Sequence, residues 1–229
     1  MKAVILAGGL GTRLYPITYE IPKPLLRIKK KPIINYLVDL FLKAGVKRIA
    51  ILISENFEED FIWWEKRYYP KKKIKFFKEK KPLGTLGGLY YLRKWVSKSD
   101  FFLTNGDELK KIDLKKMKDF HQKKEVLATI ALVKVKNPQD YGVVVCKNGI
   151  VQKFLEKPQN PPSKYINSGL YIFSPGIFKY HPGPKFSMIE TNLFPKLAKK
   201  RELAGFKFDG KWTDCGQWDS YEKAIKTWK

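Results

Sequence analysis

Residues 2–14 read K-A-V-I-L-A-G-G-L-G-T-R-L and join a short apolar run to a glycine-rich turn. The run is too short for a helix and ends directly in glycines, which is typical of a strand buried on both faces of a sheet. The glycines let backbone N–H groups approach phosphate oxygens, and Arg13 adds a planar, permanently charged guanidinium. Because ligands of open α/β sheets bind at the carboxyl ends of strands, this stretch predicts a central strand followed by a phosphate-binding loop.

Three other interpretations of the glycine turn fit the sequence less well. A Walker A loop requires G-x-x-x-x-G-K-[ST], and no lysine stands at the required place. A dinucleotide fingerprint requires a third glycine where this chain has Leu14, and Glu55, the acidic residue that ends the second strand, is too distant. A merely tight turn would not need three glycines followed by Thr-Arg. We therefore favour a loop that holds phosphate.

A strand–helix–strand order follows the opening strand. After Pro32, apolar residues recur every three to four positions up to Ala44, and Gly45 follows as a stop, which predicts a helix. Residues 46–53, V-K-R-I-A-I-L-I, read as the next strand. The connection is long enough for a parallel pair, so the order predicts an α/β sheet.

The chain then repeats this order once and becomes rich in strands. Further helices are expected at residues 55–68, at 85–95 and from the cap Asp113 to about Lys124. Further extended segments are expected at residues 74–78, 101–104, 127–133, 142–145, 150–155 and 165–173. Ser187 and Glu190 have the spacing of a capping box, which predicts a helix start. Since no linker or repeat separates the halves, we expect one domain over residues 1–229, an α/β half fused to a β-rich half.

Composition limits the class of protein. The 229 residues carry 46 basic and 22 acidic side chains, a formal net charge of +24, and 40 of the basic residues are lysines spread along the chain. This diffuse coat lacks the arginine clusters of specific nucleic-acid readers, so we expect no specific nucleic-acid partner, although the positive field attracts small polyanions. Cys146 and Cys215 form no metal-binding or disulfide pattern. No apolar run is long enough to span a membrane and no cleavable leader is present, which predicts a cytoplasmic protein.

Seven short motifs in order resemble those of the sugar-phosphate nucleotidyltransferases, the NDP-sugar pyrophosphorylases. They are L-A-G-G-L-G-T-R-L with I-P-K-P-L (residues 6–14 and 21–25), P-L-G-T-L-G-G (82–88), N-G-D (105–107), Y-G-V-V (141–144), E-K-P (156–158), I-N-S-G-L-Y (166–171) and W-T-D-C-G (212–216). The resemblance implies a Rossmann-like, three-layer α/β fold with a mostly parallel mixed sheet and a β-rich sugar-binding half. It implies a reaction in which a sugar 1-phosphate attacks the α-phosphorus of a nucleoside triphosphate, giving an NDP-sugar and pyrophosphate.

The chemistry of that reaction assigns roles to charged residues. The attacking phosphate oxygen is already ionised and needs no general base, so the protein must position two polyanions and neutralise the charge of the leaving pyrophosphate. Asp107 follows an apolar strand, and Asp214 lies in a Trp-flanked segment. These two carboxylates are expected to hold Mg²⁺, which prefers oxygen ligands and bridges substrate phosphates. Glu108 is expected to be a surface residue.

Further site residues follow from the resemblance. Lys23, mounted between Pro22 and Pro24, would contact the nucleotide phosphates together with Arg13. Lys157 would bind the phosphate of the sugar and Glu156 a sugar hydroxyl. The nucleotide is expected to contact Leu6, Ala7, Gly8, Gly9, Gly11, Thr12, Arg13, Lys23, Pro82, Gly84, Thr85 and Gly106. The sugar is expected to contact Gly142, Glu156, Lys157 and Asn167, although Asn167 could equally bond to a neighbouring strand.

The motif P-L-G-T and residues 185–198 resemble guanylyltransferases acting on mannose 1-phosphate or heptose 1-phosphate, so GTP is the favoured nucleotide. Thymidylyl or uridylyl transfer to glucose 1-phosphate, transfer to a non-sugar phosphate, and a non-catalytic regulatory paralogue are the alternatives. Members of that group often continue into a left-handed β-helix after the catalytic domain. This chain ends one expected helix past Trp212, so we expect no such tail.

Overall fold

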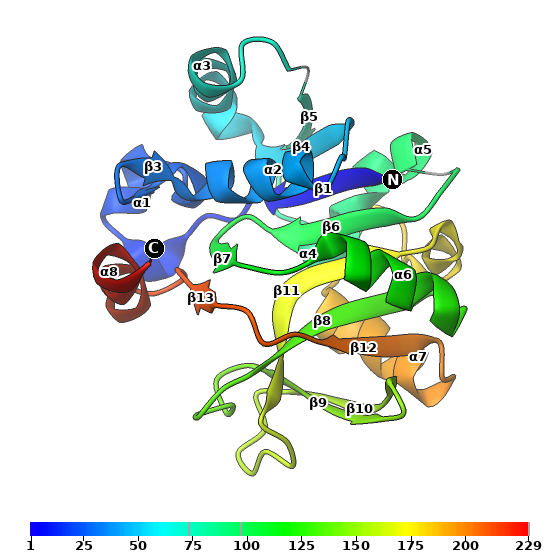
Figure 1. Cartoon of the computed structure of the whole chain (residues 1–229). Helices are drawn as coiled ribbons and strands as arrows, with labels where there is room; N and C mark the ends of the chain where they lie inside the picture. The colour runs from blue at the N-terminus through cyan, green and yellow to red at the C-terminus, as the bar shows by residue number, and fades with distance from the viewer. Residues whose placement is uncertain (73, 97, 229) are drawn as a thin grey trace. The chain divides into compact units, whose positions relative to one another are not determined.

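The computed structural model of the chain describes residues 1–72, 74–96 and 98–228, and its elements fall into two compact units (Figure 1). The first unit contains Met1–Pro82, Thr104–Lys111 and Lys211–Lys229, and the second contains Leu83–Leu103 and Ile112–Gly210. Strand β6 (Phe101–Asn105) carries the chain from the second unit back into the first. The single domain expected over residues 1–229 stays a prediction.

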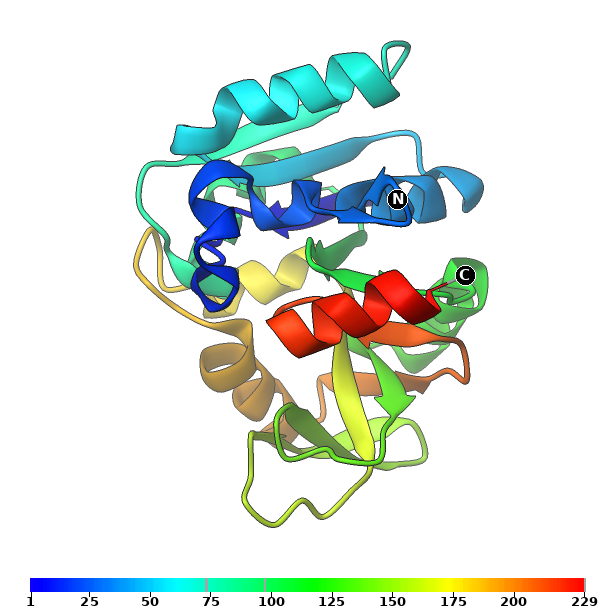
Figure 2. The same cartoon turned by 90° about the vertical axis from the view of Figure 1, so that its left-hand side faces the viewer.

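The sheet of the first unit is parallel. Strand β1 (Lys2–Ala7) pairs with β4 (Ile49–Ser54), and β4 pairs with β5 (Lys75–Glu79). Helix α2 (Ile33–Lys43) buries the side chains that recur at the predicted spacing, and Gly45 follows it with a φ of 78°. Helix α3 (Glu58–Tyr68) lies along β5 in Figure 2, and its Trp64 indole donates a hydrogen bond to Asn35 of α2 at 2.6 Å. The predicted strand–helix–strand order and its parallel pair are confirmed.

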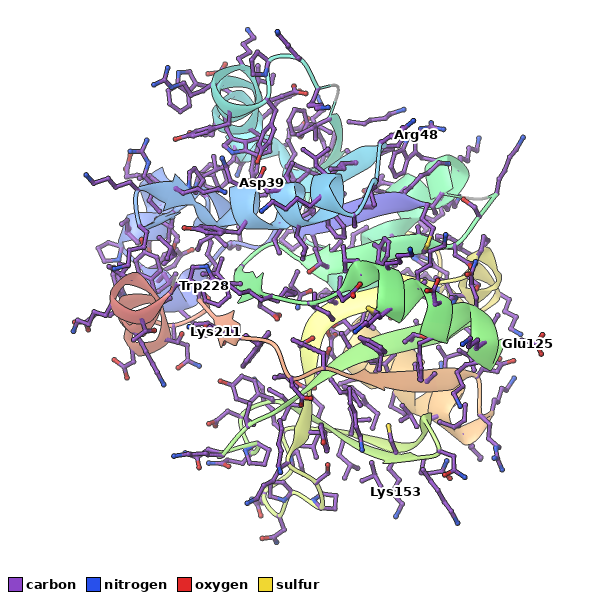
Figure 3. All side chains as sticks on the ribbon, viewed as in Figure 1. Asp39, Arg48, Glu125, Lys153, Lys211 and Trp228 are labelled. Carbon is purple, nitrogen blue, oxygen red and sulfur yellow. The ribbon has the colours of Figure 1, made fainter. Side chains whose placement is uncertain are left out.

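Segments far apart in sequence share a second apolar core in the first unit. Strands β7 (Glu108–Lys110) and β13 (Trp212–Asp214) form an antiparallel pair, and helix α8 (Trp218–Thr227) follows. Residues of these elements belong to one buried apolar cluster, which consists of Leu14, Leu26, Ile28, Ile33, Leu109, Cys215, Tyr221, Ala224 and Trp228. Trp228, labelled in Figure 3, is 5% exposed and packs edge-on against Tyr36. The other elements are η1 (Thr12–Leu14), α1 (Ile17–Glu20), η2 (Lys23–Leu25), β2 (Arg27–Ile28), β3 (Lys31–Pro32) and η3 (Glu55–Phe57).

The second unit is rich in strands, as the sequence predicts. Strand β8 (Ala128–Lys134) pairs antiparallel with β11 (Tyr165–Phe173) and parallel with β12 (Leu203–Lys207). Strand β10 (Ile150–Glu156) pairs antiparallel with β12 and with β9 (Gly142–Lys147), and β9 also meets β11. The helical elements are α4 (Gly84–Gly87), α5 (Leu89–Val96), α6 (Leu114–Lys124), η4 (Pro175–Tyr180), η5 (Ile189–Leu193) and α7 (Phe194–Lys199). The predicted α/β class with a mixed sheet is confirmed.

The structure confirms one predicted cap and contradicts another. The Asp113 carboxylate accepts hydrogen bonds from the N–H groups of Lys115 and Lys116, both at 3.0 Å, so it caps α6 as expected. The capping box at Ser187 and Glu190 is wrong, because Met188 is the N-cap and the N–H groups at this end donate to Asn192 and Thr85 instead. The residues that follow form a π-helical turn, and the Glu190 carboxylate bonds to Thr85 instead. Within the described part of the chain, no helix has the length and apolar character needed to cross a membrane.

Element boundaries differ from the predictions where local sequence is ambiguous. The strand expected from residue 46 begins at Ile49. The helix expected over residues 85–95 is interrupted, with α4 ending at Gly87 and α5 beginning at Leu89. Glycine is a weak helix former, so a break at Gly88 is physically reasonable.

Candidate active site

The glycine loop leaves the carboxyl end of β1 and turns sharply at Gly11. Gly11 has a φ of 68°, and its carbonyl accepts hydrogen bonds from the Leu14 N–H at 2.8 Å and from the Thr18 hydroxyl at 2.9 Å. Thr18 is buried, whereas Thr12 and Arg13 are exposed. The backbone of the loop is therefore held by the buried Thr18, while the side chains of Thr12 and Arg13 are exposed.

Gly106 brings the loop after β6 against the end of β1. Its N–H donates a hydrogen bond to the Leu6 carbonyl at 2.8 Å. A Cβ on Gly106 would lie 2.7 Å from that carbonyl oxygen and 3.2 Å from Cγ of Pro24. Only glycine allows this approach, and it places the next residue, Asp107, beside the segment that carries Lys23.

Lys23 and Asp107 form a largely buried ion pair. The Nζ of Lys23 lies 2.7 Å from Oδ2 of Asp107, and the two side chains are 8% and 24% exposed. Lys23 lies in the tight turn η2 after Pro22, where the Leu25 N–H donates to the Pro22 carbonyl, as its proline bracket predicts. Burial by itself would raise the pKa of Asp107, but Lys23 and Arg13 hold it below its usual range. Asp107 is therefore an ionised carboxylate at neutral pH.

The β7–β13 pair brings Asp214 to Asp107. In this pair Asp214 is registered with Glu108, and the Cys215 N–H donates a hydrogen bond to the Asp107 carbonyl at 3.0 Å. Burial and the Asp107 carboxylate raise the pKa of Asp214, while the Gly216 N–H, which donates to Asp214 Oδ1 at 2.7 Å, lowers it. A Cβ on Gly216 would lie 3.1 Å from Nη2 of Arg13. The structure thus gathers Arg13, Lys23, Asp107 and Asp214 in the first unit.

Glu108 is not the surface residue that we expected. It is 7% exposed, and its carboxylate accepts hydrogen bonds from Asn105 Nδ2 at 2.9 Å and from Trp212 Nε1 at 2.8 Å. The Nζ of Lys110, whose side chain is fully buried, lies 3.5 Å from Glu108 and donates to the Thr104 hydroxyl at 3.0 Å. Burial raises the pKa of Glu108 to about 7, although Lys110 opposes this shift.

The physical reason for this error is the spacing of Glu108 and Lys110. Alternate residues of a strand share one face, so the pattern E-L-K predicts a polar face turned to solvent when no partner is known. Here Trp212 and Thr104 supply polar partners, and the polar face of β7 is buried. The tryptophan in W-T-D was the sequence signal that could have indicated such a partner.

Glu79 is a second residue that the sequence analysis missed. It ends β5 at the carboxyl edge of the parallel sheet and is only 6% exposed. Its carboxylate approaches the glycine loop so closely that a Cβ on Gly8 would collide with Oε2. An acidic residue at the end of the third parallel strand was the available signal, because parallel strands end at the same edge.

The motif P-L-G-T-L-G-G, which was expected to contact the nucleotide, is held by internal contacts of the second unit. Gly84 has a φ of 75°, which favours glycine. The Thr85 hydroxyl accepts a hydrogen bond from the Ile189 N–H and donates one to the Glu190 carboxylate, both at 2.9 Å. Pro82, the first residue of this motif, is exposed and is the last residue of the first unit's opening segment.

The expected sugar residues lie together in the second unit. Glu156 is registered with Gly142, and a Cβ on Gly142 would lie 3.0 Å from Glu156 Oε2 and 2.5 Å from the Phe154 ring. Lys157 is exposed, has a φ of 45°, and donates its N–H to the Tyr141 carbonyl. Burial raises the pKa of Glu156, and so does the negative charge of Glu190.

Asn167 joins this group through strand pairing. Ile166 is registered with Val143, the residue after Gly142, so Asn167 lies at the same end of β9. Its Oδ1 accepts from the Gly169 N–H and its Nδ2 donates to the Tyr171 hydroxyl, both at 2.9 Å. The side chain is therefore oriented by β11, and the second hydrogen of Nδ2 has no partner among the residues that the structure describes.

Comparison with known proteins identifies the family of this chain. A family model described as Nucleotidyl transferase matches residues 2–229. The mannose-1-phosphate guanylyltransferase catalytic subunit beta of Xenopus tropicalis is 38% identical over 225 residues, which are 95% of this chain and 61% of that protein. The mannose-1-phosphate guanyltransferase of Yarrowia lipolytica is 38% identical over 223 residues with the same coverage. The chain thus spans about three fifths of the length of these relatives.

A solved structure is similar over the full length. The crystal structure of HddC from Yersinia pseudotuberculosis has a TM-score of 0.83 and 32% identity, covering 100% of this chain and 99% of that one. The same protein complexed with GMP-PN matches at 31% identity, with the same coverage and a TM-score of 0.81.

Replacing Lys110 by methionine tests the buried network. Lys110→Met leaves Glu108 buried beside Asp107 and Asp214 without its cation, and we expect a loss of about 3–5 kcal/mol in the free energy of unfolding. Urea denaturation followed by circular dichroism measures it. The double variant Glu108→Gln/Lys110→Met removes both charges and should recover part of this loss.

The matched control for this prediction is Lys226→Met. Lys226 pairs with Glu222 on the surface of α8, where an ion pair adds little stability. A Lys110→Met variant that is as stable as the control would contradict the role given to the network.

Proposed function

This chain belongs to the nucleotidyl transferase family, and we propose that it transfers a nucleotidyl group from a nucleoside triphosphate to a sugar 1-phosphate. The products are an NDP-sugar and pyrophosphate. The observation that carries this proposal is the meeting of Arg13, Lys23, Asp107 and Asp214 in the unit that contains the glycine loop.

The residues of the first unit suit the charge changes of this reaction. An ionised oxygen of the sugar phosphate forms a bond to the α-phosphorus, and the bond to the bridging oxygen of the β-phosphate breaks, so that pyrophosphate leaves with the electron pair. No proton has to be removed from the nucleophile. Lys23, Arg13 and the backbone N–H groups of the glycine loop offset the charge of the triphosphate and of the leaving group.

Asp107 and Asp214 have the donor set that a magnesium ion requires. Both are carboxylates, and Mg²⁺ prefers oxygen ligands and completes its shell with substrate phosphates and water. Oδ1 of Asp107 and Oδ2 of Asp214 accept no hydrogen bond from any residue in the described ranges, so each side chain has an oxygen for a cation. No cluster of three or more His, Cys, Asp or Glu side chains suited to a metal occurs among the described residues. Such an ion would neutralise phosphate charge and polarise the α-phosphate.

The sugar phosphate is assigned to the second unit. Lys157 supplies an exposed ammonium for its phosphate, and Glu156 supplies a carboxylate for a hydroxyl. The missing side chain at Gly142 leaves room for the Phe154 ring and the Glu156 carboxylate, and Asn167 lies at the same end of β9.

GTP and mannose 1-phosphate are the proposed substrates. Relatives at 38% identity are named mannose-1-phosphate guanylyltransferases, and the similar HddC structure was obtained with GMP-PN. The position of Glu79 supports a guanine base, because a carboxylate accepts hydrogen bonds from both N1–H and the exocyclic amino group of guanine. Its closeness to Gly8 puts this acceptor at the nucleotide loop.

The proposal is tested by pyrophosphate release across a grid of nucleoside triphosphates and sugar 1-phosphates with Mg²⁺. We expect the fastest release with GTP and mannose 1-phosphate. Asp107→Ala should lower kcat by about 100-fold or more, because it removes a metal ligand and a charge in the transition state. Its circular dichroism should match wild type, and Asp219→Ala, at an exposed aspartate of α8, should keep full activity. No release with any pair, despite binding of nucleotide, would reject the proposal.

The two lysines should affect different substrates. Lys23→Ala should raise KM for the nucleotide by about tenfold, because it loses a charge-assisted contact, and should leave KM for the sugar phosphate nearly unchanged. Lys157→Ala should do the reverse. Steady-state kinetics with one substrate saturating separates the two constants. If both variants raised KM for the same substrate, this assignment would be wrong.

Glu79→Gln should weaken the choice of base. The amide keeps the shape of the side chain but offers one acceptor oxygen and no charge, so the ratio of kcat/KM for GTP to that for ATP should fall about tenfold or more. Glu55→Gln, at an exposed glutamate near the end of the neighbouring strand, is the matched control. An unchanged ratio in Glu79→Gln would remove this residue from base recognition.

A further inference from the structure

Helix α4 is held in place by residues 181–190, which lie far from it in the sequence. We call these residues the clamp segment. The Ser187 carbonyl accepts hydrogen bonds from the Leu86 N–H at 2.9 Å and the Gly87 N–H at 3.1 Å. The Ser187 N–H donates to the Leu83 carbonyl at 2.9 Å, and His181 Nε2 donates to the Leu86 carbonyl at 2.8 Å. The helix that follows Pro82 thus owes its backbone bonding largely to the clamp segment.

The backbone of the clamp segment lies against the two glycines of α4, Gly84 and Gly87. A Cβ on Gly84 would lie 2.5 Å from the Ser187 carbonyl oxygen, and a Cβ on Gly87 would collide with the Lys185 carbonyl. Both obstacles are backbone atoms, which cannot swing aside as a side chain can. The small residues of P-L-G-T-L-G therefore serve the packing between α4 and the clamp segment, in addition to any contact with a base.

One side-chain pair joins the two segments. The Thr85 hydroxyl donates to Oε2 of Glu190 and accepts from the Ile189 N–H, both at 2.9 Å, so its single proton is used inside the protein. Glu190 is carried by a π-helical turn, a rare conformation that occurs often at functional sites. The sequence spacing S-x-x-E would have used this carboxylate to cap its own helix, yet the carboxylate leaves the cap and reaches α4.

We infer that Thr85 and Glu190 are positioning residues, which fix the orientation of α4 for the nucleotide through their hydrogen bond instead of touching the substrate themselves. The inference rests on the proposed function, because the motif that contains α4 is one of those expected to contact the nucleotide. It assigns to Glu190 a task that the resemblance in sequence did not give it. It also means that the side chain of Thr85, which was expected to contact the nucleotide, does not do so directly.

The test is a set of variants at these two positions, with both KM values measured. Thr85→Val keeps the shape of the side chain but removes the hydroxyl, and should raise KM for the nucleotide about tenfold, with KM for the sugar phosphate changed less than twofold. Thr85→Ser keeps the hydroxyl and should stay within twofold of wild type for both substrates. Glu190→Gln combined with Thr85→Val should be no worse than Thr85→Val alone, because the two side chains act through one hydrogen bond.

Thr191→Val is the matched control. Thr191 lies next to Glu190 in the same turn and is exposed, and its hydroxyl donates to Oδ1 of Asn192 at 3.3 Å. This variant should keep the wild-type constants. Nucleotide binding measured by calorimetry supplies a readout that does not depend on turnover, and thermal unfolding shows whether each variant is folded.

The outcomes separate this inference from the proposed function. If wild type shows no release of pyrophosphate with any substrate pair, the proposed function fails. If wild type is active but Thr85→Val binds nucleotide as tightly as Thr191→Val, the positioning role is wrong. Should Thr85→Val not fold, the decision passes to Glu190→Leu, which removes the acceptor of the Thr85 hydroxyl; its nucleotide KM must then rise while Thr191→Val stays at the wild-type value.

Discussion

The first unit is organised around two carboxylates of like charge that are kept together in a largely buried place. Asp107 and Asp214 repel each other, and burial adds to the cost because it removes the water that would screen them. The ammonium of Lys23 at 2.7 Å and the guanidinium of Arg13 offset this repulsion. The paired strands β7 and β13 then hold the two backbones in register, so the carboxylates cannot separate without breaking the ladder.

A second layer of polar contacts supports that ladder from inside. Glu108 and Lys110 point to one face of β7, and Trp212 of β13 donates to the same carboxylate that Asn105 and Lys110 approach. Buried polar groups are stabilising only when they are satisfied, and here no buried side-chain N or O atom of the described residues lacks a partner. In the proposed function Asp107 and Asp214 would hold a cation, and this network would orient them without touching it.

In the second unit, hydrogen bonds from a distant segment hold the short helix α4 in place. A loop with two glycines has little structure of its own, and helix α4 has only four residues. The clamp segment supplies its missing hydrogen bonds from Ser187 and His181, while Thr85 and Glu190 add a contact between side chains. The short helix α4 is thus held in a defined position by a segment that is distant in sequence. Residues of a site need such support from their surroundings.

Local physics was sufficient for much of this protein. The apolar run of β1, the three-to-four-residue spacing of α2 with its glycine stop, and the Asp113 cap all depend on neighbours in sequence, and each was predicted. Motif and chemistry also singled out the glycine loop, Lys23 between its prolines and both aspartates. The structure brings Lys23, Asp107 and Asp214 together in the first unit, and the roles expected of them stay predictions. Tertiary structure alone decided where the polar groups of Glu79, Glu108, Lys110 and Glu190 would find partners. Those partners lie on other strands and turns, and a buried carboxylate cannot be told from an exposed one until the group that bonds to it is known.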